Sequence, residues 1–90
     1  MARYVFTAWF RDELAADDDQ DREWPACFVI DASSAQDALA WGNHLARSFS
    51  ARRESEIFLR SEVEDGIDSA QDKLPLVVAG REASDAEIGW

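Results

Sequence analysis

The chain has 90 residues, 47% of them hydrophobic and 11% aromatic, which suits one packed domain over residues 1–90 and excludes a disordered chain. Its formal net charge is -10, with 19 acidic residues against 9 Lys and Arg. Because phosphate groups repel such a polyanion, this charge argues against direct binding to nucleic acid.

Two apolar runs with strand character open the chain. Residues 3–11 alternate between two faces and contain β-formers throughout, which predicts a first strand. Residues 12–23 are crowded with carboxylates and show no period, so we expect a long hairpin connection. Residues 24–31 are apolar on both faces, as in an interior strand, and Pro25 is tolerated because it lies where the strand begins.

An amphipathic pattern predicts one helix from Ser33 to about Arg53. Ser33 would cap its N-terminus, and Gln36, three residues later, completes a capping box. Gly42 lies at the centre of the apolar stripe, where the missing side chain allows close contact with a strand, so we interpret it as a packing glycine. The stripe must be buried, and its other members are Ala35, Ala38, Leu39, Leu45, Ala46 and Phe49.

Two further strands and a short turn complete the pattern. Residues 56–64 alternate as a third strand, and residues 74–80 form a fourth, whose Pro75 predicts a position at the edge of the sheet. Residues 84–87 again have a capping-box pattern, which predicts one helical turn near the end of the chain.

This order predicts a single-domain α+β fold of the ββαββ type, a four-stranded mixed sheet with the helix on one face. A right-handed crossover makes the second and third strands parallel, and we expect the first and fourth to run antiparallel to their sequence neighbours. The bulkier strand faces are assigned to the helix side, with Tyr4, Phe6, Phe10, Phe28, Ile30, Ile57 and Leu59.

The opposite face of the sheet is predicted to be an apolar surface that needs cover. It would present Val5, Trp9, Cys27, Val29 and Phe58, and so large a patch favours a homodimer. The alternative is that the C-terminal turn covers this face with Ile88 and Trp90 and leaves a monomer. Exposed Trp is enriched at binding hot spots, so three further residues are candidate partner anchors: Trp24, Trp41 and Trp90. The alternative is that they pack at the edge of the core.

The residues that carry chemistry are few. His44 is the only histidine and points away from the apolar stripe, and Cys27 lies in an apolar strand, where a thiol behaves as a small hydrophobe. We place the two on opposite sides of the helix and sheet. Asp17, Asp19 and Asp21 begin like a calcium loop, but the later ligand positions do not match. We therefore predict no catalytic residue, no metal and no cofactor.

Three functional hypotheses follow. The leading one is a noncatalytic protein-interaction domain, homodimeric through the second sheet face and acting in the cytoplasm, since a single cysteine suits a reducing compartment and the N-terminal apolar run is too short to cross a membrane. The second is an acidic inhibitor or immunity-type protein that binds a basic enzyme such as a nuclease. The third is a small enzyme or ligand carrier with a pocket at the dimer seam, for which the polar or reactive groups are Tyr4, Cys27, His44 and Arg60.

Overall fold

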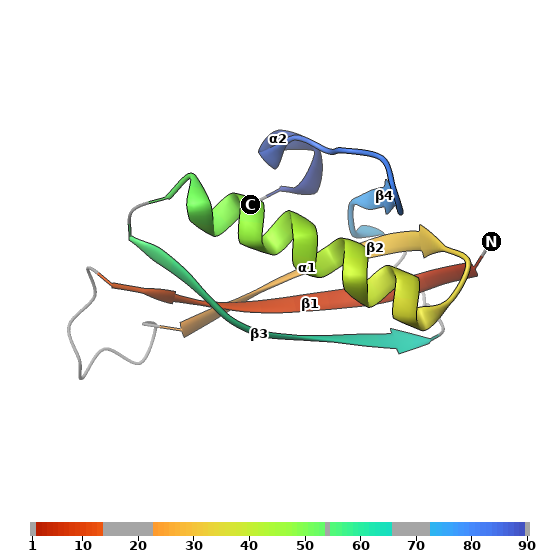
Figure 1. Cartoon of the computed structure of the whole chain (residues 1–90), viewed down its shortest axis with the longest axis horizontal. Coiled ribbons are helices and arrows are strands. Elements are labelled where there is room, and N and C mark those ends of the chain that lie inside the picture. The colour runs from red at the N-terminus through yellow and green to blue at the C-terminus, as the bar shows by residue number, and fades with distance from the viewer. Residues whose placement is uncertain (1, 14–22, 54, 66–72, 90) are drawn as a thin grey trace.

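A four-stranded mixed sheet carries one long helix on one of its faces (Figure 1). The computed structural model describes residues 2–13, 23–53, 55–65 and 73–89. The α+β class, the ββαββ order and the short C-terminal helical turn are confirmed. The elements are β1 (Ala2–Asp12), β2 (Glu23–Ala32), α1 (Ala35–Ala51), β3 (Glu56–Asp65), β4 (Leu76–Val78) and α2 (Asp85–Ile88).

The strands lie in the order β3-β1-β2-β4. Because β1 pairs antiparallel with both β2 and β3, those two strands run parallel, as predicted, with β1 between them. The fourth strand is at the edge, as Pro75 indicated, but it pairs in parallel with β2. It therefore runs parallel to β3, and the prediction that it runs antiparallel to the third strand is wrong. It is also shorter than predicted, because the chain turns at Gly80, whose φ of 87° suits glycine.

Helix α1 covers one face of the sheet with most of the predicted apolar stripe, although Ala35 in its first turn is exposed. Ser34, one residue later than predicted, is the N-cap, and its hydroxyl accepts a hydrogen bond from the Asp37 backbone N–H at 3.1 Å. The helix packs on the alternate residues of β1 and β2 that face it. The ring centroids of Phe6 and Phe28 lie 5.2 Å apart at the centre of this core. Five residues of the helix are buried: Ala38, Gly42, Leu45, Ala46 and Phe49.

A bulge in β3 changes which of its side chains face the helix. The pairing with β1 shifts between Trp9 and Phe10, so that Phe10 lies opposite Phe58 and Trp9 opposite Arg60, with Leu59 as the extra residue. Phe58 therefore packs into the core, 5.8 Å from the Phe10 ring. The predictions that Phe58 lies on the opposite face and that Ile57 faces the helix are wrong.

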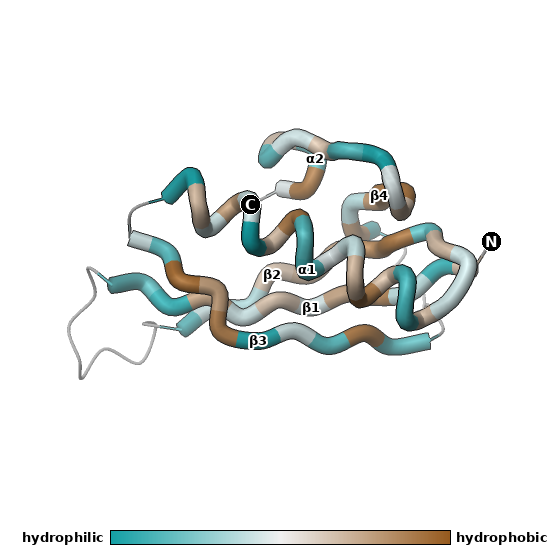
Figure 2. The backbone as a smooth tube through the Cα atoms, in the orientation of Figure 1, coloured by the Kyte–Doolittle hydropathy of each residue, from teal (hydrophilic) through white to brown (hydrophobic). Residues whose placement is uncertain are grey.

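The C-terminal segment packs beside α1 and β4, on the helix side of the sheet (Figure 2). Ile88 of α2 is 4% exposed and belongs to the core, while Arg52, just after α1, forms an ion pair with Asp85. The alternative in which Ile88 covers the opposite sheet face is therefore wrong. Trp90 lies outside the described residues.

Candidate interaction surface

The sheet face away from α1, here called the far face, has Trp9 near one end. The register places the Trp9 side chain between Pro25 on β2 and Arg60 on β3. The Arg60 guanidinium carbon lies 4.9 Å from the centroid of the indole, and Arg60 also forms an ion pair with Glu23 at 3.3 Å. A cation over the ring and strands on both sides fix the orientation of this half-buried aromatic residue.

Three neighbours extend the apolar surface around Trp9. Pro25 and Cys27 are exposed on β2, and Ile57, which lies opposite Arg11, is 38% exposed. We call Trp9, Pro25, Cys27 and Ile57 the Trp9 patch. Charged residues surround it, namely Arg11, Glu23, Arg60 and Glu62.

The predicted interface residues do not contribute equally to this surface. Val5 and Val29 pair with each other on the far face, but they are only 5% and 4% exposed, so they offer little area to a partner. Phe58 lies on the helix side. Cys27, in contrast, is exposed instead of acting as a small buried hydrophobe, and its Sγ lies 3.4 Å from the Thr7 hydroxyl. Of the five predicted residues, Trp9 and Cys27 remain accessible.

The candidate anchors Trp24 and Trp41 both pack at the edge of the core. The Trp24 ring stacks on Phe10 at 4.9 Å, and its indole N–H donates to a Glu56 carboxylate oxygen at 2.8 Å. Trp41 stacks on His44 at 4.7 Å and lines a hollow of about 350 Å³ next to Gly80. Its Nε1 is buried without a hydrogen-bond partner in the part of the chain that the structure describes. Trp90, the third candidate, is outside that part.

The groups named for an enzyme do not converge. His44 is exposed on α1, where its Nε2 lies 2.7 Å from Glu82, and Cys27 is on the far face, so the two are on opposite sides as predicted. Tyr4 is 9% exposed in the core, while Arg60 lies over Trp9. Among the described residues there is also no group of three His, Cys, Asp or Glu side chains that could hold a metal ion.

No family model, curated protein or solved structure matches this chain. No helix within the described ranges is long and apolar enough to cross a membrane. The surface is therefore interpreted from its own geometry. Sequence reasoning missed Pro25 and Ile57 as parts of this surface. Pro25 indicates only the start of a strand. The bulge that moves Ile57 to the far face leaves no mark in the alternating pattern of β3.

Proposed function

We propose that this chain is a noncatalytic protein-interaction domain that forms a homodimer through the Trp9 patch and acts in the cytoplasm. The observation that supports it is a partly exposed Trp with an apolar ring of neighbours and a charged rim, on a sheet face that no described helix covers. Trp anchors surrounded by polar rims are typical of binding hot spots. In the cytoplasm the exposed thiol of Cys27 stays reduced.

A second copy suits this surface because the charges beside it are of both signs. Arg60 and Glu62 are exposed two residues apart on the same strand face. A two-fold axis between stacked sheets can bring Arg60 of one copy near the partner's Glu62, and the reverse contact follows by symmetry. Electrostatic complementarity of this kind selects a partner and its orientation more than it adds affinity.

The test uses a charge placed in the middle of the patch. Val29 is too deeply buried to replace without affecting folding, whereas Cys27 is exposed. Cys27→Lys should lower the mass measured by light scattering at micromolar concentration below that of the parent, because two ammonium groups would face each other near the axis and the face contact would be lost. Ala40→Lys, which adds the same charge on the exposed side of α1, should leave the dimer intact. A parent protein that is already monomeric at this concentration would rule out the face dimer.

A basic protein is the second candidate partner, as expected for an inhibitor or immunity-type protein. The net charge of -10 supports this alternative, since opposite charge speeds association. A pull-down with the immobilised chain would then recover a basic enzyme at low salt and lose it at high salt. Equal recovery at both ionic strengths, or recovery of no basic protein, would count against it.

A further inference from the structure

The outer edge of β4 carries backbone groups that no other described strand uses. The ladder with β2 involves alternate residues, because the Val29 N–H donates to the Pro75 carbonyl at 2.8 Å and the Ala79 N–H donates to Asp31 at 2.9 Å. Leu76 and Val78 therefore point their N–H and C=O groups away from β2. In the described structure, Leu76 makes no hydrogen bond on this side, and its side chain is 47% exposed.

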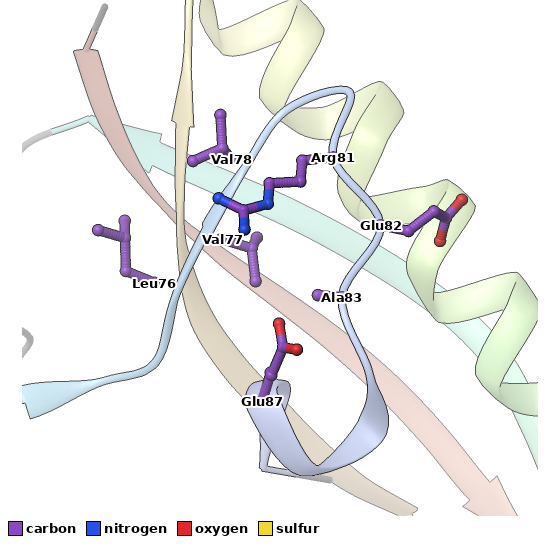
Figure 3. Close-up of a pocket in the computed structure, with 7 residues that line it drawn as sticks. All are labelled: Leu76, Val77, Val78, Arg81, Glu82, Ala83 and Glu87. Carbon is purple, nitrogen blue, oxygen red and sulfur yellow. The ribbon is translucent and has the colours of Figure 1, made fainter.

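A cation and an anion that form no ion pair within the described part of the chain lie beside this edge. Figure 3 shows Arg81 and Glu87 pointing into a hollow of about 150 Å³ between β4 and the C-terminal segment. Neither side chain forms an ion pair with any described residue, whereas the neighbouring Glu82 is engaged with His44. The edge thus brings together the outward N–H and C=O of Leu76, the Val78 N–H and charges of both signs, none of which pairs with a described residue.

The two charges lie at opposite ends of the strand. Arg81 follows the turn after Val78, and its backbone N–H donates to the Val78 carbonyl at 3.0 Å. Glu87 lies near the end of the strand that follows Pro75. Gly89, two residues after Glu87, is close to Pro75, since a Cβ added to Gly89 would lie 3.6 Å from the Pro75 ring. An antiparallel neighbour with the same sequence reverses this order, so its Glu87 would meet Arg81 and its Arg81 would meet Glu87.

We propose that a second copy of the chain pairs antiparallel along β4, with a two-fold axis at Val77. In this register Leu76 lies opposite the partner's Val78, the Leu76 carbonyl accepts a hydrogen bond from the partner's Val78 N–H, and Arg81 forms an ion pair with the partner's Glu87. The side chain of Leu76, which shares the far face with Val29, packs on the partner's Val78. Because β4 has three residues, backbone bonds alone are few, and the two symmetric ion pairs fix the register.

This edge contact is independent of the face contact proposed above. Edge pairing extends the sheet sideways and leaves the far faces of both copies on the same side, with their Trp9 patches open. The face contact instead stacks one sheet on another. The two can therefore be removed separately, and the Cys27→Lys chain, in which the face contact is disrupted, isolates the edge contact.

The experiment measures self-association of the full Cys27→Lys chain by sedimentation equilibrium up to the upper micromolar range, at physiological ionic strength so that net repulsion is screened. We expect a dimer. Arg81→Glu and Glu87→Arg should each weaken it by about tenfold or more, since each loses two pairs and creates two like-charge contacts. The double variant should restore the dimer, because every pair is re-formed with its charges exchanged. Arg47→Glu and Glu64→Arg make the same charge changes at exposed sites elsewhere and should have no effect.

The other outcomes decide between the two contacts. If the Cys27→Lys chain is monomeric and the parent is a dimer, the face contact exists and the edge contact does not. If the parent and the variant are both monomeric, neither contact exists. If the single variants weaken the dimer and the double variant does not restore it, Arg81 and Glu87 do not pair across the axis. A parent dimer that Cys27→Lys leaves unchanged and Arg81→Glu disrupts would support the edge contact and remove the face contact. Circular dichroism of each variant confirms that it is folded.

Discussion

The backbone of Gly42 lies directly on the ring of Phe6, so that a Cβ at position 42 would overlap ring atoms Cγ, Cδ2 and Cε2. This confirms the interpretation of Gly42 as a packing glycine. It also explains how α1 approaches β1 closely over a fully buried aromatic side chain. The Phe6 ring lies against Phe28 and has little room to move aside.

Gly42→Ala should therefore destabilise the protein even though alanine is the better helix former. The gain in helix propensity is about 1 kcal/mol, whereas overpacking a core costs about 1 to 3 kcal/mol and here involves a rigid ring. We expect a net loss in the free energy of unfolding, measured by urea denaturation. Ala40→Gly, at an exposed site of α1, reports the propensity difference without the clash. A more stable Gly42→Ala variant would show that the helix can lift away from Phe6.

Ile88 anchors the C-terminal segment on the helix side of the sheet. Because it is 4% exposed within the core, Ile88→Ala should lower the free energy of unfolding by about 2 to 5 kcal/mol. The backbone amides of α2 should also exchange with solvent faster, since α2 is a single turn that depends on this contact. Ala86→Ser, at an exposed position of the same turn, serves as the control. A loss no larger than that of the control would contradict the position assigned to Ile88.

The two tryptophans at the edge of the core should respond differently to the same substitution. Trp24→Phe removes a hydrogen bond to a carboxylate, which is worth about 1.5 to 3 kcal/mol. Trp41→Phe removes an indole N–H that has no acceptor among the described residues, so no hydrogen bond is lost. We expect the larger loss in urea denaturation for Trp24→Phe, with Glu56→Gln giving an intermediate value. Equal losses would mean that the Trp24–Glu56 bond contributes no stability.

Much of this fold could be predicted because its signals are local. The apolar stripe of α1 and the alternation of β1 both depend on residues close together in sequence, and their predicted bounds agree with the structure to within a few residues. The edge position of β4 follows from Pro75, which cannot donate a hydrogen bond to a neighbouring strand. The packing role of Gly42 follows from its position in the stripe.

The predictions that were wrong concern features that depend on pairing between segments distant in sequence. Nothing in residues 56–64 marks Leu59 as the bulge, because an extra residue is defined by what lies opposite it on β1. The same applies to β4, since either edge of the sheet was compatible with its sequence. The prediction of the candidate site was affected most, because a shift of one residue in the register of β3 moves Phe58 into the core and exposes Ile57 beside Trp9.

The thiol of Cys27 provides a direct report on the far face. It is the only cysteine and is exposed in the single chain, so it should react with a thiol reagent in the native state without denaturant. If copies stack through the Trp9 patch, the thiol becomes covered, and its reaction rate should fall as the protein concentration rises. Edge pairing through β4 leaves Cys27 open, so there the rate should not change with concentration. A Thr7→Val variant, which removes the nearby hydroxyl, distinguishes this coverage from a local effect on the thiol, because it should change the rate at every concentration alike.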